Sequence, residues 1–138
     1  MQLKQFAVSA LLASTLALLS GCASVYRTPG AEASKLADLA VLEYNGDIAG
    51  VGVSEVDGKY RGVGIFRRFE LVPGDRSVTV YLANYTIKAM PITLKFSAQA
   101  GSTYDLLYEV RPTSTRAGSW NAWIIDKQSG KTVSAKAS

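Results

Sequence analysis

Few side chains in this chain could carry out covalent or acid–base chemistry. The 138 residues include one cysteine, Cys22, and no histidine. Histidine is the commonest general base, the commonest ligand of transition metals and the usual partner of a serine or cysteine nucleophile. Catalysis would therefore have to come from carboxylates, lysines or tyrosines.

The carboxylates show no spacing that suits catalysis. Asp105 and Glu109 are four residues apart in an expected strand, so they share one face and lie roughly 13 Å apart. Glycosidase carboxylates are about 5 Å or about 6.5–9.5 Å apart, so surface charges with cross-strand basic partners are the better interpretation. Asp126 precedes the turn Gln128-Ser129-Gly130, and we expect it to stabilise this turn rather than bind calcium. We expect no catalytic residue, no metal site and no cofactor.

The first 21 residues have the layout of a secretory signal. Lys4 supplies the positive charge, and residues 6–19 form a 14-residue apolar stretch. This length suits a signal peptide and is short for a membrane-spanning helix, which needs about 20 apolar residues. The small residues Ser20 and Gly21 then lead to Cys22.

The sequence Leu19-Ser20-Gly21-Cys22 resembles the lipobox of bacterial lipoproteins. The resemblance implies cleavage between Gly21 and Cys22, a diacylglyceryl thioether on the Cys22 sulfur, and an acyl group such as palmitate on the new amino terminus. Two or more acyl chains hold a protein to a bilayer almost permanently. A thioether sulfur can act neither as a nucleophile nor in a disulfide. An ordinary signal peptide with an incidental cysteine is the alternative.

The residues after the cysteine bear on location. In lipoproteins of diderm bacteria an aspartate at this position commonly marks retention in the inner membrane, whereas this chain has Ala23 and then Ser24. The resemblance therefore implies an outer-membrane protein that faces the periplasm, with display on the cell surface as the alternative. Loss of residues 1–21 removes Lys4 and leaves 14 basic against 11 acidic side chains, which is too mild an excess to indicate nucleic-acid binding.

Short strands separated by turn dipeptides predict the fold class. Inward and outward residues alternate in several segments, among them 78–82, 92–97 and 104–110. We expect a single antiparallel β-sandwich of about seven to nine short strands over residues 37–138, with an open barrel as the alternative. Residues 22–36, which include Thr28-Pro29-Gly30, are expected to form a flexible tether.

Two strands carry more specific expectations. Gly50 and Gly52 leave room for a bulge or a close neighbour in the strand over 48–56. Residues 66–72 have no cleanly apolar face, which indicates a strand that is partly exposed or near an edge of its sheet.

Three features in order extend over residues 66–133. They are Leu71-Val72-Pro73-Gly74 before an alternating strand, Ala100-Gly101 before Tyr104, and the sequence over 120–131. In these features the chain resembles a group of uncharacterised lipoproteins of Proteobacteria, and its turn and strand resemble the PEGA-type β-sandwich repeat of cell-envelope proteins. Members often have a histidine soon after the turn, where this chain has Arg76 or Ser77. The resemblance therefore implies no metal or catalytic role.

Aromatic side chains are the best candidates for a binding surface. They are Trp120, Trp123, Tyr85 and Tyr108. Trp120 and Trp123 are three positions apart, so in a strand they point to opposite faces, and one of them could offer a platform for a sugar ring or for the apolar surface of a partner. In the alternative interpretation both tryptophans pack, and the tyrosines cap the edges of the core.

These observations favour a non-catalytic, lipid-anchored envelope protein. We expect a binding or accessory scaffold domain that contacts another envelope protein through a sheet face, an edge or a loop. The alternative is a ligand-binding module for glycan, peptidoglycan fragments or a small apolar molecule. The expected partners are the membrane, through the lipid on Cys22, and an envelope protein, but neither nucleic acid nor metal.

Overall fold

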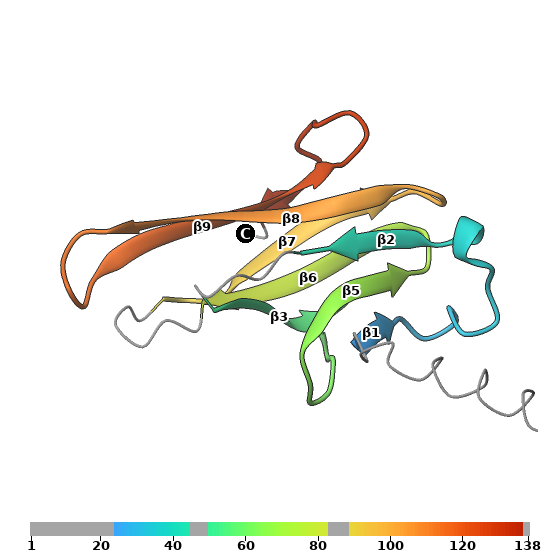
Figure 1. The fold of residues 1–138 in the computed structure, drawn as a ribbon, viewed down its shortest axis with the longest axis horizontal. Coiled ribbons are helices and arrows are strands. Elements are labelled where there is room, and N and C mark those ends of the chain that lie inside the picture. The colour runs from blue at the N-terminus through green and yellow to red at the C-terminus, as the bar shows by residue number, and fades with distance from the viewer. Residues whose placement is uncertain (1–23, 45–49, 83–88, 137–138) are drawn as a thin grey trace, which may run out of the picture.

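The computed structural model describes residues 24–44, 50–82 and 89–136. These residues form ten strands and one short 3-10 helix, η1 (Leu36–Asp38). The strands make two five-stranded sheets that stack in two layers (Figure 1). The predicted all-β sandwich is confirmed. The signal peptide, Gly21, Cys22 and Tyr85 lie outside the described residues. Within the described residues, no helix has the length and apolar composition needed to cross a membrane.

The first sheet contains both parallel and antiparallel strand pairs. Its strands, in spatial order, are β1 (Ser24–Arg27), β5 (Phe66–Leu71), β2 (Ala40–Glu43), β8 (Thr103–Pro112) and β9 (Gly118–Asp126). The β1–β5 and β2–β8 pairs are parallel, and the β5–β2 and β8–β9 pairs are antiparallel. The edge strands β1 and β9 therefore lie at opposite sides of this sheet.

The second sheet is antiparallel throughout. Its strands, in spatial order, are β10 (Ala135–Lys136), β7 (Ile92–Ala98), β6 (Gly74–Leu82), β3 (Val51–Val56) and β4 (Lys59–Tyr60). The predicted alternation is present, because Val78, Val80 and Leu82 of β6 are buried and the residues between them are not. The inner faces of both sheets form one main core, in which the rings of Phe96 and Tyr104 meet edge to face with centroids 5.2 Å apart.

The segment that was predicted to be a flexible tether belongs to the sandwich from Ser24 onward. β1 pairs with β5, and Thr28 is only 2% exposed. The Thr28 backbone N–H donates to the carbonyl of Glu70 (3.0 Å), and its hydroxyl accepts from the N–H of Val72 (3.0 Å). Small residues and a Pro-Gly turn are compatible with a flexible chain, but here a ladder to a distant strand orders them.

β5 is partly exposed and lies next to the edge strand β1, as its mixed composition predicts. Its inward residues Phe69 and Leu71 are buried, and its outward charges are paired with charges on neighbouring strands.

The expectation of a bulge or a close neighbour in β3 is confirmed in both respects. The register between β3 and β6 shifts between Val53 and Glu55, and the ring of Tyr81 lies over Gly52.

Candidate binding surface

The two tryptophans lie on opposite faces of β9, as predicted. Trp120 shares the inner row with the buried Ala122 and Ile124, is itself half-buried and packs against the core. Its indole Nε1 donates to the carbonyl of Met90 (2.9 Å). Trp123 occupies the outer row and is also half-buried. The packing interpretation therefore holds for Trp120, and Trp123 is the tryptophan on the outside of the sandwich.

The four predicted aromatic residues do not form one surface. Tyr108 of β8 pairs across the ladder with Ala122 and packs against the core at the same end as Trp120. Trp123 is separated from both by the thickness of the sheet, and Tyr85 lies outside the described residues. Of the predicted set, only Trp123 faces outward from a described strand.

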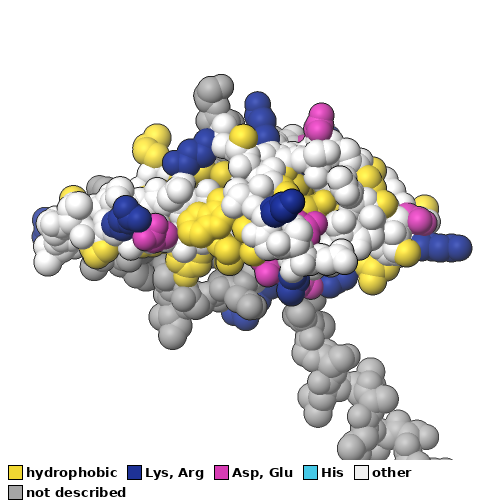
Figure 2. Space-filling model, turned by 90° about the horizontal axis from the view of Figure 1, so that it is seen from above, with side chains coloured by type: hydrophobic (Ala, Val, Ile, Leu, Met, Phe, Trp, Pro, Cys, Tyr) yellow, Lys and Arg dark blue, Asp and Glu magenta, His cyan; other side chains and the backbone are white. Residues whose placement is uncertain are grey.

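Trp123 belongs to a short apolar row on the outer face of the β8–β9 pair. Leu107 lies directly opposite it in the ladder, and Ile125 lies opposite Asp105. We call Leu107, Trp123 and Ile125 the outer apolar row. Leu107 is 37% exposed, and the other two are half-buried. Figure 2, which looks down on β8 and β9 from the top of Figure 1, shows hydrophobic side chains gathered near the middle of this face with charged side chains on both sides.

A chain of ion pairs crosses the same outer face from β1 to the turn after β9. Arg27 and Arg68 donate to Glu70 (2.6 and 3.3 Å), and Arg68 also donates to Glu43 (2.9 Å). Lys127 donates to Glu43 (3.0 Å) and lies 3.8 Å from Asp105. We call this set of six residues the charged row. It carries three acids and three bases, so it stabilises the sheet face without giving that face a net charge.

The charged row bears out the prediction for Asp105 but not for Glu109. Asp105 has a basic neighbour from another element, Lys127. Glu109 instead pairs with Arg111 on its own strand, two residues further along. In a strand, residues two apart share a face, so the long arginine can fold back without a cross-strand partner.

Two titratable groups at this end of the face have perturbed pKa values. The hydrogen bond to Glu43, with the nearby Asp105 charge, raises the pKa of Lys127 above its usual value. The backbone N–H of Ser129 donates to Asp126 Oδ1 (2.8 Å), and this bond lowers the pKa of the Asp126 carboxyl. The predicted turn-stabilising role of Asp126 is confirmed.

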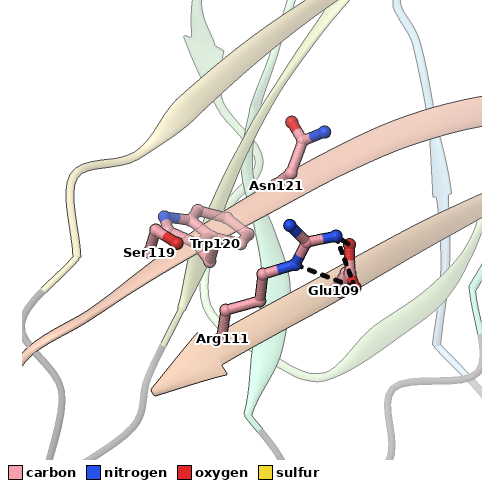
Figure 3. Close-up of a pocket in the computed structure, with 5 residues that line it drawn as sticks. All are labelled: Glu109, Arg111, Ser119, Trp120 and Asn121. Carbon is pink, nitrogen blue, oxygen red and sulfur yellow. Dashed lines mark hydrogen bonds and ion pairs between the residues drawn. The ribbon is translucent and has the colours of Figure 1, made fainter. Parts of the chain in front are cut away.

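A small pocket lies near the tip of the β8–β9 hairpin. Its lining residues are Glu109, Arg111, Ser119, Trp120 and Asn121. Figure 3 shows the Arg111 guanidinium turned toward the Glu109 carboxylate, so the one acidic group of the pocket is already engaged. The volume of about 160 Å³ is below the range of roughly 300–1,000 Å³ for small-molecule sites. This geometry suits a surface contact better than an enclosed ligand.

Sequence reasoning identified Trp123 but missed its neighbours. The signal for Leu107 was present, because it is an apolar residue between Asp105 and Glu109 on what is otherwise a polar face. No group of three or more potential metal ligands occurs among the residues that the structure describes. No family model, curated protein or solved structure matches the chain. The fold and this outward-facing row are therefore the basis for any functional conclusion.

Proposed function

We propose that the chain is a non-catalytic lipoprotein of the outer membrane, and that its sandwich binds another protein of the cell envelope. The observation that carries this proposal is the outer apolar row beside the charged row. The lipobox-like sequence that ends at Cys22 and the resemblance to proteobacterial lipoproteins support the location.

The composition of this face suits a protein partner. Protein interfaces commonly have an apolar centre and a polar rim, and tryptophan is one of the residues that most often dominate the binding energy. Here Trp123 and Leu107 supply the apolar centre. Lys127 and Asp105 lie at one side of it, and Arg111 with Glu109 lies at the other. Exposed charges of this kind set orientation and specificity more than affinity.

The inventory of chemical groups supports a binding role over an enzymatic one. Without histidine, and with its sole cysteine at the proposed acylation site, the chain lacks the usual nucleophile–base pairs. Three of the outward carboxylates, those of Glu43, Glu70 and Glu109, are engaged in ion pairs. Turnover of an envelope substrate by the purified protein, lost when one carboxylate is neutralised, would refute this part of the proposal.

Co-purification from gently solubilised membranes tests the proposal. We expect one stoichiometric partner with the native chain and loss of that partner with Leu107→Asp, which places a charge in the outer apolar row. Ser97→Asp is the matched control, because Ser97 is exposed on the outer face of the second sheet. Cys22→Ala should also reduce recovery of the partner, since the anchor brings the two proteins to one membrane.

Two results would contradict the proposal. One is the absence of any partner with the native chain. The other is equal recovery with Leu107→Asp and Ser97→Asp, provided that thermal unfolding shows both variants to be folded. If no partner is found and sugars or lipids quench the tryptophan fluorescence, the chain is a ligand-binding module instead.

A further inference from the structure

The loop that joins β4 to β5 exposes apolar side chains at its tip. Val63 is 92% exposed, Ile65 is 77% exposed, and Tyr60 at the end of β4 is 67% exposed. We call these three residues the apolar loop. The stretch from Lys59 to Arg67 also carries three basic side chains and no acidic one. Single exposed apolar residues are ordinary, but three of them in one basic loop call for an explanation.

The loop holds this conformation through Arg61. Its guanidinium donates to the carbonyl of Val53, to that of Gly62 (3.0 Å) and to that of Gly64 (2.6 Å). It also lies over the ring of Phe66, 4.9 Å from the centroid. The loop is therefore tied to the sandwich at its base, and Val63 and Ile65 remain directed away from the core.

The apolar loop lies where the N-terminal segment meets the sandwich. Ser24, the first residue of β1, is the ladder partner of Phe66, the first residue of β5. The two strands are parallel, so both begin at the same end, as Figure 1 shows for β1 and the loop before β5. The Phe66 ring contacts Tyr26 of β1, with centroids 6.0 Å apart.

The proposed lipid attachment site is therefore close to the loop. Cys22 precedes Ser24 by two residues, and two residues of extended chain span at most about 7 Å. Acyl chains on Cys22 would extend into the apolar layer of the bilayer, and Cys22 itself would lie at the level of the headgroups. The β1 end of the sandwich, together with the loop beside it, would then be held at the membrane surface.

We propose that the apolar loop inserts into the bilayer beside the lipid on Cys22 and forms a second membrane contact of the protein. This inference rests on the anchor in the proposed function. Insertion removes the side chains of Val63 and Ile65 from water. Tyr60 is suited to the headgroup region, where tyrosine is enriched. Lys59 and Arg67 can approach anionic headgroups, each with a modest attraction that falls with salt.

Insertion would also orient the sandwich. β1 lies at one edge of the first sheet and β9 at the other. Four strand spacings separate them, or about 19 Å at ~4.8 Å each. Two contacts at the β1 edge would hold β9 and the outer apolar row away from the lipid, where a protein partner can reach them. A lipid tether alone would leave the sandwich free to tilt.

Vesicle binding by the mature chain, residues 22–138, with Cys22→Ser tests the loop separately from the anchor and from the signal peptide. The probes are vesicles of phosphatidylcholine, with and without about one quarter phosphatidylglycerol. We expect weak, salt-sensitive binding that is stronger with phosphatidylglycerol. The double variant Val63→Ser/Ile65→Ser should bind about tenfold more weakly, because it withdraws two aliphatic side chains from the apolar layer. Both residues are exposed, so the fold should be unaffected.

Met90→Ser is the matched control, because Met90 is 82% exposed and precedes β7, on the side of the second sheet away from β4. It should bind as the parent chain does. Equal binding by the loop variant and the Met90 variant, or no binding by the parent at millimolar lipid, would overturn the loop contact. Mass spectrometry of the native chain tests the anchor independently, because a Cys22 without acyl groups refutes the proposed function and leaves the vesicle result intact.

Discussion

Thr28 holds the segment that follows β1 against β5 and the residue after it. Its hydroxyl accepts from the N–H of Val72, and the side chain is almost fully buried. Thr28→Val keeps the shape but leaves this N–H without its acceptor, so we expect a loss of about 1–2 kcal/mol in the free energy of unfolding. Denaturant unfolding gives this value, and hydrogen exchange should show faster exchange of the Val72 amide.

Thr28→Ser is the control for that experiment. It retains the hydroxyl, so the Val72 amide should keep its protection even if loss of the methyl group lowers stability slightly. Unchanged exchange at Val72 in Thr28→Val would mean that residues 24–31 do not pack against β5 and that they form the flexible tether after all.

Asp126 gives a residue-scale prediction for pH. Hydrogen bonds from the turn, first of all from the Ser129 N–H, stabilise its carboxylate and lower its pKa below the usual 3.8. The unfolded chain therefore binds this proton at a higher pH than the folded chain does. As a result, the free energy of unfolding rises with pH between the folded and the unfolded pKa of Asp126. The contribution is present above the unfolded pKa and is lost as pH falls through the folded pKa. An NMR titration that gives the Asp126 carboxyl a pKa above 3.8 would contradict this interpretation.

Gly52 and Tyr81 form a matched pair between β3 and β6. A Cβ at Gly52 would lie 2.6 Å from the Tyr81 hydroxyl oxygen and 2.7 Å from Cζ. Gly52→Ala must therefore displace the ring, and we expect it to destabilise the protein by about 1–3 kcal/mol. In the Tyr81→Ser background the clash is absent, and the same substitution should be neutral or stabilising by up to about 1 kcal/mol.

A double-mutant cycle measures this coupling directly. If Gly52→Ala has the same effect with and without the tyrosine ring, the ring does not cover the glycine. Sequence reasoning anticipated a close neighbour at this position because glycine in a strand often marks one. It did not identify Tyr81, because the pairing of β3 with β6 depends on contacts between distant segments.

The same distinction accounts for the rest of the fold. Alternation in β6, β7 and β8 is local, since each residue's face follows from its place in its own strand. The sequence therefore predicted the buried rows and the opposite faces of Trp120 and Trp123. The parallel pairing of β1 with β5 is not local, and it makes a strand of residues that were expected to belong to a flexible tether. The sequence shows that Leu107 is apolar on a polar face, but its place opposite Trp123 follows only from the register of β8 and β9.

At the scale of the whole molecule, the two proposals assign different tasks to opposite edges of one sheet. The β1 edge lies beside the proposed anchor and the apolar loop, and the β9 edge carries the outer apolar row. The charged row connects them across β5 and β2. Its ion pairs join strands that are far apart in the sequence, so this face should keep its shape when a partner binds.

Site-specific photo-crosslinking in intact cells can show whether the outer apolar row binds a protein partner. A photoreactive phenylalanine analogue would replace Leu107 in the outer apolar row, or Ser97 on the outer face of the second sheet as a control. We expect one discrete protein adduct from position 107 and none from position 97. No adduct from position 107, or the same adducts from both positions, would contradict a partner surface on β8 and β9.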